Sequence, residues 1–362
     1  MTSELAGSSD GGAEFTYAES GVDIDAGERA VELMRTAVAR TNRPEVVGGL
    51  GGFAGLFALD TAHYRRPLLA SSTDGVGTKI ALARQLDRHD TVGIDLVAMV
   101  VDDLVACGAE PLFLQDYIAC GRVVPEKIAA IVTGIAAGCT QAGAALVGGE
   151  TAEHGDLMAA DDYDLAATAV GVVEADAVLG PERVRAGDAI VAMASSGLHS
   201  NGYSLVRRVV AAAGLDLTAT PPGLGRPLGE ELLEPTRIYA RDCLALVERF
   251  GVEGVHAFAH ITGGGLAGNT ARVVPDGLVA VLDRGTWALP SVVRLLEAYG
   301  VPRGESERAF NCGVGMVAAV APDRADAAVA LLAEREVPAW VAGTVRRRAD
   351  EPAACLVGDY RD

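Results

Sequence analysis

Asp74 lies in the stretch of this 362-residue chain whose residue types most directly suggest chemistry, Ser71-Ser72-Thr73-Asp74-Gly75-Val76-Gly77-Thr78-Lys79. An apolar run precedes it, and apolar residues at helical spacing follow from Ile80. We therefore predict a strand, a tight glycine loop and the start of a helix. At such a loop, the Asp74 carboxylate can hold a divalent ion that bridges to a phosphate.

The glycine loop offers an anion site of its own. Gly75 and Gly77 let the backbone approach a ligand, and Thr78 and Lys79 lie in the first helical turn, where anions bind readily. The chain has 30 Lys plus Arg residues but only two lysines, Lys79 and Lys127. A compact ammonium group is therefore expected to be needed at position 79. An ordinary glycine turn explains the short motif equally well, and the Walker spacing is absent.

Two further groups of carboxylates follow. Asp95, Asp102 and Asp103 gather on one side of an apolar helix predicted over residues 93–104. A buried carboxylate is costly unless it is paired or bound to a metal, so we expect at least one, most simply Asp103, to face a site. A predicted strand ends in Gly148-Gly149-Glu150, which places Gly149 and Glu150 at a sheet edge; a solvated turn is the alternative.

His199 lies in a dense polar turn, Ser195-Ser196-Gly197-Leu198-His199-Ser200-Asn201-Gly202, between a predicted strand and a predicted helix. Ser196 and Asn201 fit a phosphate cradle there, and His199 could act as acid, base or cationic clamp. A solvated loop histidine is the alternative. A second candidate cradle is Thr262-Gly263-Gly264-Gly265, which opens another predicted helix.

Strands and helices alternate along both halves of the chain, which favours an α/β fold of two domains. We predict a flexible N-terminal segment at residues 1–24, an N-terminal domain at 25–179 and a C-terminal α/β domain at 180–362. We predict helices at 28–38, 80–86, 93–104, 125–141, from 205, from 234 and at 323–335. We predict strands at 57–60, 67–70, 111–118, 144–147, 165–174, 189–194, 310–316 and 339–345.

Composition narrows the possible partners. The formal net charge is −19, which argues against binding to nucleic acid or to an anionic membrane. A nucleotide would need local cations, most simply Mg²⁺. The six cysteines include no C-x-x-C pair and are expected to be buried thiols in a reducing compartment. Without a signal pattern or a long apolar span, we expect a cytoplasmic protein.

Taken together, these motifs resemble the aminoimidazole ribonucleotide synthetase family, also called phosphoribosylformylglycinamidine cyclo-ligase. The resemblance rests on the order of nine stretches: 21–24, 44–53, 73–79, 93–99, 148–153, 195–204, 235–239, 262–265 and 310–316. It implies ATP-dependent cyclisation of formylglycinamidine ribonucleotide, a step of purine biosynthesis. It also implies a homodimer in which the N-terminal domains form a shared β-barrel, and a C-terminal domain with a helix-covered mixed sheet.

The resemblance also implies roles for residues. His199, Asp74, Asp103 and Lys79 are the catalytic candidates, and Asp74, Asp103 and Glu150 are the candidates for binding Mg²⁺. The nucleotide-binding candidates are Gly75, Gly77, Thr78, Gly149, Asp95, Ser196, Asn201, Thr262, Gly263 and Gly264. Ala18 departs from the family, which often has lysine there, and His154-Gly155-Asp156 replaces its Met-Pro-Gly.

Other readings share parts of this pattern. A thiamine monophosphate kinase-like enzyme is the alternative activity, and selenophosphate synthetase and the hydrogenase-maturation carbamoyl dehydratase are related candidates. Selenophosphate synthetase would need a reactive cysteine near the N-terminus, but the first cysteine is Cys107. A non-catalytic scaffold is the alternative of a different class, and the combination of Asp74, Asp103, Lys79 and His199 speaks against it.

Overall fold

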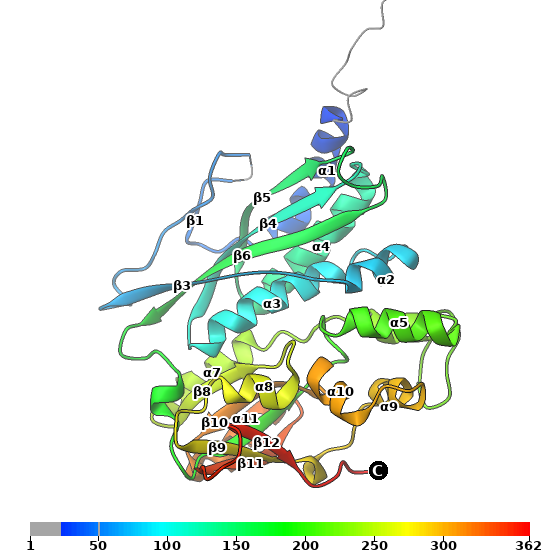
Figure 1. Cartoon of the computed structure of the whole chain (residues 1–362). Helices are drawn as coiled ribbons and strands as arrows, with labels where there is room; N and C mark the ends of the chain where they lie inside the picture. The colour runs from blue at the N-terminus through cyan, green and yellow to red at the C-terminus, as the bar shows by residue number, and fades with distance from the viewer. Residues whose placement is uncertain (1–22, 50) are drawn as a thin grey trace, which may run out of the picture.

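The computed structural model describes residues 23–49 and 51–362. The predicted flexible segment lies outside these residues except for its last two positions, and so does Ala18. The described chain contains a four-stranded sheet in its first half and a six-stranded sheet in its second, besides a small two-stranded pair, and both large sheets are covered by helices (Figure 1). The predicted two-domain α/β fold is confirmed, whereas the barrel shared by two chains stays a prediction.

The first half is built on a four-stranded mixed sheet of order β3-β6-β4-β5. β3 and β4 both pair antiparallel with β6, and β4 pairs parallel with β5. A short antiparallel pair, β1 and β2, precedes the sheet. The strands are β1 (Val46–Val47), β2 (Leu56–Phe57), β3 (Pro67–Gly75), β4 (Glu110–Cys120), β5 (Ala145–Glu153) and β6 (Tyr163–Glu174).

Within the residues that the structure describes, helices lie on only one face of this sheet. α3 packs directly against β3 and β6, and α4 and α1 follow behind it (Figure 1). Asp23 caps α1 by accepting a hydrogen bond from the backbone N–H of Ala26. The helices of this half are α1 (Ile24–Ala39), α2 (Lys79–Gln85), α3 (Val92–Ala106) and α4 (Pro125–Ala142).

The second half is built on a six-stranded sheet of order β12-β9-β11-β7-β10-β8. Alternate residues of β7 point to opposite faces: Val191 joins the core with α11, and Ile190 joins the core with α8. The strands are β7 (Ala189–Ala194), β8 (Val255–His260), β9 (Leu278–Asp283), β10 (Val314–Val320), β11 (Ala339–Arg347) and β12 (Ala354–Val357); the helices are α5 (Tyr203–Ala213), α6 (Leu228–Leu232), α7 (Ala240–Phe250), α8 (Gly265–Ala271), α9 (Ser291–Ala298), α10 (Arg303–Ala309) and α11 (Ala325–Glu334).

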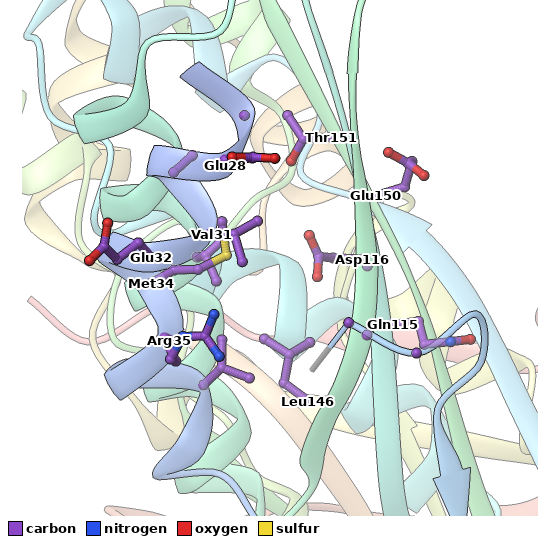
Figure 2. Close-up of a pocket in the computed structure, with 18 of the residues that line it drawn as sticks. Glu28, Val31, Glu32, Met34, Arg35, Gln115, Asp116, Leu146, Glu150 and Thr151 are labelled. Atoms are coloured by element: carbon purple, nitrogen blue, oxygen red, sulfur yellow. The ribbon is translucent and has the colours of Figure 1, made fainter. Parts of the chain in front are cut away.

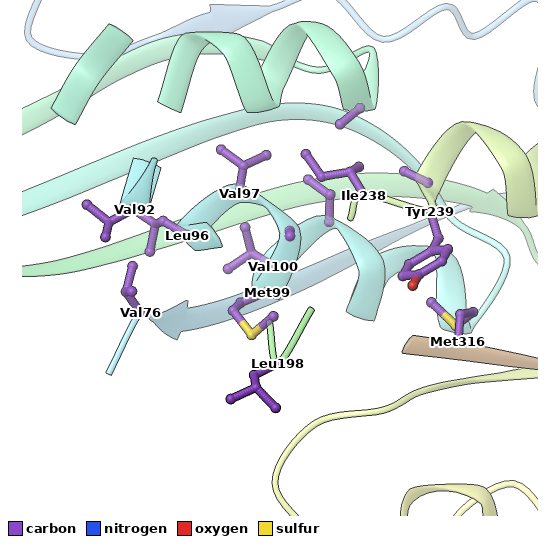
Figure 3. Close-up of a cluster of buried hydrophobic side chains, with 14 of the residues drawn as sticks. Val76, Val92, Leu96, Val97, Met99, Val100, Leu198, Ile238, Tyr239 and Met316 are labelled. Carbon is purple, nitrogen blue, oxygen red and sulfur yellow. The ribbon is translucent and has the colours of Figure 1, made fainter. Parts of the chain in front are cut away.

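α3 joins the two halves through one apolar core. Figure 3 shows Leu96, Val97 and Val100 of α3 packed near Ile238 and Tyr239 from the second half of the chain. Nearly every residue of α3 is buried, as its all-round apolar character predicts. Loops from the second half that contact α3 are therefore held in fixed positions relative to the first domain.

Several predicted elements differ in their extent. The strand predicted at 310–316 begins only at Val314 (β10), because residues 312–313 form a turn. β3 continues through Ser71–Gly75, so Asp74 lies in a strand and only residues 76–78 form the loop. β5 continues through Gly148–Glu153, so Glu150 does not end a strand. The helix predicted from residue 234 begins only at Ala240, because the segment before it bonds to buried side chains.

None of the described helices is long and apolar enough to cross a membrane. All six cysteines are free thiols, and two of them, Cys107 and Cys355, are only half-buried. The prediction of unpaired thiols is confirmed, and the prediction that all are buried is wrong for these two.

Candidate functional site

The Lys79 ammonium lies in a fully buried cluster. Its side chain is 0% exposed, and Nζ donates to Asp95 Oδ1 at 2.9 Å, to the His199 carbonyl at 3.0 Å and to the Glu234 carbonyl at 2.6 Å. The three N–H groups of an ammonium are thereby all used. The structure therefore leaves Lys79 no donor for a phosphate, in contrast to the role predicted from the sequence.

Asp95, which we assigned to nucleotide binding, belongs to the same cluster. Besides Lys79, its Oδ1 accepts from the backbone N–H and the hydroxyl of Thr236, at 2.8 and 2.6 Å. Burial raises the pKa of Asp95, while Lys79 and Thr236 oppose that shift. Opposite charge and hydrogen bonds are what make a buried carboxylate tolerable on this apolar helix, so Asp95 faces a loop rather than a cavity.

His199 is next to this cluster, because its carbonyl accepts from Lys79, and its ring is also buried. Its Nε2 accepts from the backbone N–H of Ser196 at 3.2 Å, and its backbone has φ +62°, a left-handed conformation. Burial lowers the pKa of His199 well below its usual range, and the positive charges of His260 and Lys79 lower it further. In this structure His199 is therefore a neutral imidazole rather than the cationic clamp considered above.

Tyr239 and Asp102, to which the sequence analysis gave no such role, complete the seat of His199. Tyr239 donates its hydroxyl to the Ala194 carbonyl at 2.8 Å, and its backbone N–H donates to Asp102 Oδ1 at 2.9 Å. Any side chain at Gly315 would overlap the Tyr239 hydroxyl and the His199 ring. Of the two glycines predicted to allow close approach, Gly315 is thus required beside this histidine, whereas Gly313 lies against Pro290.

Asp103 lines a separate cavity of about 350 Å³ between β3 and β8, together with Ser71, Ser72 and Arg272. Its carboxylate is 45% exposed and accepts from His260 Nδ1 at 3.0 Å. Of the three α3 carboxylates, Asp103 is the one that faces a cavity, and its place in a functional site stays a prediction. The other two, Asp95 and Asp102, are fully buried.

Asp74 and the glycine loop lie further along β3. The Asp74 side chain is exposed and accepts from the Gly75 N–H at 2.7 Å. Gly77 has φ +75°, as a tight turn requires, and the Thr78 hydroxyl lies 3.1 Å from that of Ser204 on α5. The loop therefore meets the second half of the chain at the start of α5.

Gly149 and Glu150 line a third region, a cavity of about 1120 Å³. It lies between α1 and β5, and Figure 2 shows Asp116 pointing into it from β4 toward α1. A side chain at Gly149 would overlap the Asp116 carboxylate. Burial raises the pKa of Asp116 to about 7, so this carboxyl group keeps its proton and is uncharged below about pH 7.

The three carboxylates predicted to bind Mg²⁺ do not meet in one chain. The strand register pairs Asp74 of β3 with Ala167 of β6, Ala167 with Asp116 of β4, and Asp116 with Gly149 of β5. Glu150 is the next residue of β5 after Gly149. Three strand spacings separate β3 from β5, or about 14 Å. Within residues 23–49 and 51–362, no three His, Cys, Asp or Glu side chains are grouped so as to hold a metal ion. Glu150 therefore cannot share an ion with Asp74 in one chain.

The two predicted phosphate cradles differ in how far their groups are already used. Asn269 donates to the carbonyls of Thr262, Gly263 and Gly265, which fixes the triple-glycine turn. The N–H groups of Gly264 and Gly265 are bonded to carbonyls as well. Asn201 lies close to the same turn, because its Oδ1 atom is 3.5 Å from the position that a Cβ atom at Gly263 would take. Ser196 instead donates its hydroxyl to the Pro235 carbonyl at 2.6 Å.

Comparison with known proteins identifies the family. The model of the AIR synthase related protein N-terminal domain matches residues 59–173, and that of the C-terminal domain matches residues 185–353. The chain belongs to the AIR synthase related family. The resemblance found in the sequence motifs is thereby confirmed.

Relatives within this family are similar over almost their whole length. A phosphoribosylformylglycinamidine cyclo-ligase of Geobacillus kaustophilus (strain HTA426) is 53% identical over 335 residues, 92% of this chain and 96% of the relative. The protein of that name from Myxococcus xanthus (strain DK1622) is 50% identical over 343 residues, 94% and 99% of the two chains.

Solved structures with the same fold are more distant. Thiamine-monophosphate kinase from Stenotrophomonas maltophilia K279a superimposes with a TM-score of 0.65 at 22% identity, covering 92% of this chain and 97% of the other. Hydrogenase maturation protein HypE in complex with ATP gives 0.63 at 19% identity and covers 91% of each chain. These two likenesses show that this chain shares its fold with a thiamine-monophosphate kinase and a hydrogenase maturation protein.

Sequence reasoning missed the roles of Asp116, His260 and Tyr239. Asp116 is flanked by Gln115 and Tyr117, so the sequence does not reveal that its side chain lies on the buried face of β4 with Leu114 and Ile118. His260 lies on β8, which we did not predict because its six residues mix small apolar residues with histidines. The glycine pair at 148–149 was the available signal for Asp116, because glycine within a strand marks a close approach.

Proposed function

We infer that this protein is an ATP-dependent cyclo-ligase that converts formylglycinamidine ribonucleotide to aminoimidazole ribonucleotide, ADP and phosphate, in purine biosynthesis. The observation that carries this proposal is identity of about half the residues to cyclo-ligases over nearly the full length of both chains. The buried His199 seat between the two halves and the nearby Asp103 cavity supply polar groups for such a reaction.

The proposed reaction has two steps. The formyl amide oxygen attacks the γ-phosphorus of ATP, and ADP leaves. The amidine nitrogen then attacks the activated carbon, the carbon–oxygen bond breaks, phosphate departs with that oxygen, and loss of a proton completes the ring. Phosphoryl transfer depends mainly on positioning and charge neutralisation rather than on covalent help from the protein.

His199 is the proposed catalytic group at the reacting oxygen. Because its Nε2 accepts from Ser196, the neutral ring carries its proton on Nδ1, which is buried and has no partner in the described chain. An N–H donor held in a dry site can stabilise negative charge that develops on the oxygen during transfer.

One or two carboxylates of a single chain would be available to hold Mg²⁺, rather than the predicted three. Asp103 and Asp74 are exposed, and Mg²⁺ in phosphoryl-transfer sites is usually held by one or two carboxylates together with substrate phosphates. When bound, the ion would neutralise phosphate charge. We propose that Glu150 contributes only where a second chain brings it to the site.

The cavity beside Asp116 is our proposed location for part of the nucleotide. Its volume of about 1120 Å³ suits a ligand of that size, and Gly149 and Glu150 line it. We further propose a homodimer and a cytoplasmic location, with no nucleic acid or membrane partner.

The test is ATP hydrolysis that depends on formylglycinamidine ribonucleotide, with the imidazole product detected by mass spectrometry. One ADP should form per product. Thiamine monophosphate is the comparison substrate, since a thiamine-monophosphate kinase shares the fold. ATP consumption with thiamine monophosphate and none with the amidine would replace this proposal with the kinase.

A further inference from the structure

We propose that Lys79 is a positioning residue for His199, acting across the domain boundary, and that it does not bind a phosphate. This inference rests on the proposed function only for its kinetic test. Its structural basis is the set of three hydrogen bonds from Nζ, each to a different segment of the chain.

The three acceptors belong to α3, to the turn after β7 and to the segment before α7. Asp95 provides the only charge among them, and the other two are the carbonyls of His199 and Glu234. Lys79 itself is the first residue of α2. A single ammonium thus ties the first domain to two loops of the second.

The contact with His199 is to its backbone, at a residue with an unfavourable conformation. A φ of +62° is uncommon for a residue with a side chain, and such conformations persist only where the surroundings hold them. The Lys79 bond to this carbonyl and the Ser196 bond to the ring hold opposite ends of the same residue. Together they fix the direction of Nδ1.

The neighbouring segment is fixed by the same cluster. Asp95 accepts twice from Thr236, and Ser196 donates to Pro235, so the loop that carries Ser196 is tied to residues 234–236. Loss of the Lys79 charge would leave Asp95 buried without its counter-ion and free both loops. The effect should appear in the chemical step, because a misplacement of about 1 Å can cost roughly 10²-fold in rate.

The first experiment tests whether Lys79 is buried, and it needs no measurement of activity. The chain has only two lysines, so acetylation of the folded wild-type protein can be followed separately at Lys79 and Lys127 by peptide mass spectrometry. The Lys127 side chain is 20% exposed, whereas that of Lys79 is 0% exposed. Without nucleotide, Lys79 should react at least tenfold more slowly than Lys127. Rapid labelling of Lys79 that ATP then suppresses would identify a phosphate contact and overturn the proposal.

The second experiment tests whether Lys79 acts through His199. We compare kcat of the wild type, Lys79→Met, His199→Ala and the double variant, with Lys127→Met as the matched control. Lys79→Met should lower kcat by roughly 10²-fold with little change in the Kd for ATP, and Lys127→Met should be near wild type. In the His199→Ala background, Lys79→Met should cost little more. Losses that multiply in the double variant would show that Lys79 acts independently of His199.

If Lys79→Met fails to fold, the paired change Lys79→Met with Asp95→Asn removes both buried charges and serves in the same cycle. A wild-type protein without cyclo-ligase activity would refute the proposed function, while the acetylation result would still decide the position of Lys79.

Discussion

Asp116 and His199 illustrate how burial, rather than residue type, sets the state of an ionisable group. Both are buried, and burial shifts the pKa of each toward its neutral form, upward for Asp116 and well downward for His199. A neutral histidine can donate from one nitrogen and accept at the other, which a cationic one cannot. Residues with such shifts are frequent in functional sites.

The raised pKa of Asp116 predicts a pH dependence of stability. The folded chain holds this proton up to about pH 7, whereas the unfolded chain releases it near 3.8. Asp116 therefore favours folding at low pH, and that contribution is lost as the pH rises from about 4 to 7. The slope should be about 1.4 kcal/mol per pH unit. The free energy of unfolding, measured by urea unfolding at pH 5, 6 and 7, should fall less steeply with pH in Asp116→Asn than in the wild type. Asp156→Asn, at an exposed residue, should leave that slope unchanged. Identical slopes for wild type and Asp116→Asn would contradict the buried, protonated carboxyl.

Asp103 and Asp74 carry the second prediction at this scale. Both are exposed, so replacement by Asn should leave folding intact. Each change should lower turnover by orders of magnitude at limiting Mg²⁺, because a phosphate-bound ion loses a charged ligand. Asp156→Asn is again the control for a simple change of charge. Normal turnover of both variants would remove them from the metal site.

At the scale of elements, α3 is the helix on which the two halves depend. It packs against α4 through glycines that permit close contact: a side chain at Gly134 would overlap the Asp90 carbonyl, and one at Gly93 would overlap the backbone of α4. On its other sides, α3 provides Asp95 and Asp102 to the segment before α7. A shift of α3 would therefore move the loops that hold His199.

Gly134→Ala should destabilise the protein by about 1–3 kcal/mol, because the overlapping group is backbone and cannot rotate away. The matched control is Gly304→Ala in α10, where an added side chain meets nothing within 4 Å. That change should stabilise by roughly 0.5 kcal/mol, since alanine loses less backbone freedom in a helix. Thermal unfolding of both variants gives the comparison. Equal stability of the two variants would mean that α3 and α4 do not cross this closely.

How well the sequence predicted each element depends on the pattern of its apolar residues and glycines. Helices α3 and α4 have long apolar periodicity and were predicted to within about two residues. β3 and β5 were cut short because Gly75, Gly148 and Gly149 normally signal turns, whereas here they admit close neighbours within a strand. The roles of Lys79 and Asp95 were not predictable, because their partners are 16 to 155 residues away along the chain.

At the scale of the whole molecule, the two sheets differ in how they are covered. Helices pack on both faces of the six-stranded sheet, whereas among residues 23–49 and 51–362 the four-stranded sheet has helices on one face only. Its other face presents Leu69, which is 68% exposed, along with Tyr117 and the Thr73–Thr168 hydroxyl pair. Apolar side chains of this size on an uncovered sheet face mark an interaction surface. The family resemblance and the separation of Asp74 from Glu150 both point to a second copy of this chain as the partner.

We therefore predict a homodimer formed through the uncovered face of the four-stranded sheet. Light scattering at micromolar concentration should give twice the chain mass of 37.2 kDa. Tyr117→Glu should produce monomers, because the new charge would be buried in the interface without a partner. Tyr299→Glu, at an exposed aromatic residue beyond α9, is the control and should remain dimeric. If Glu150 of one chain completes the metal site of the other, the Tyr117→Glu monomer should also lose its Mg²⁺-dependent turnover. A wild-type protein that stays monomeric and fully active would contradict both the dimer and the shared site.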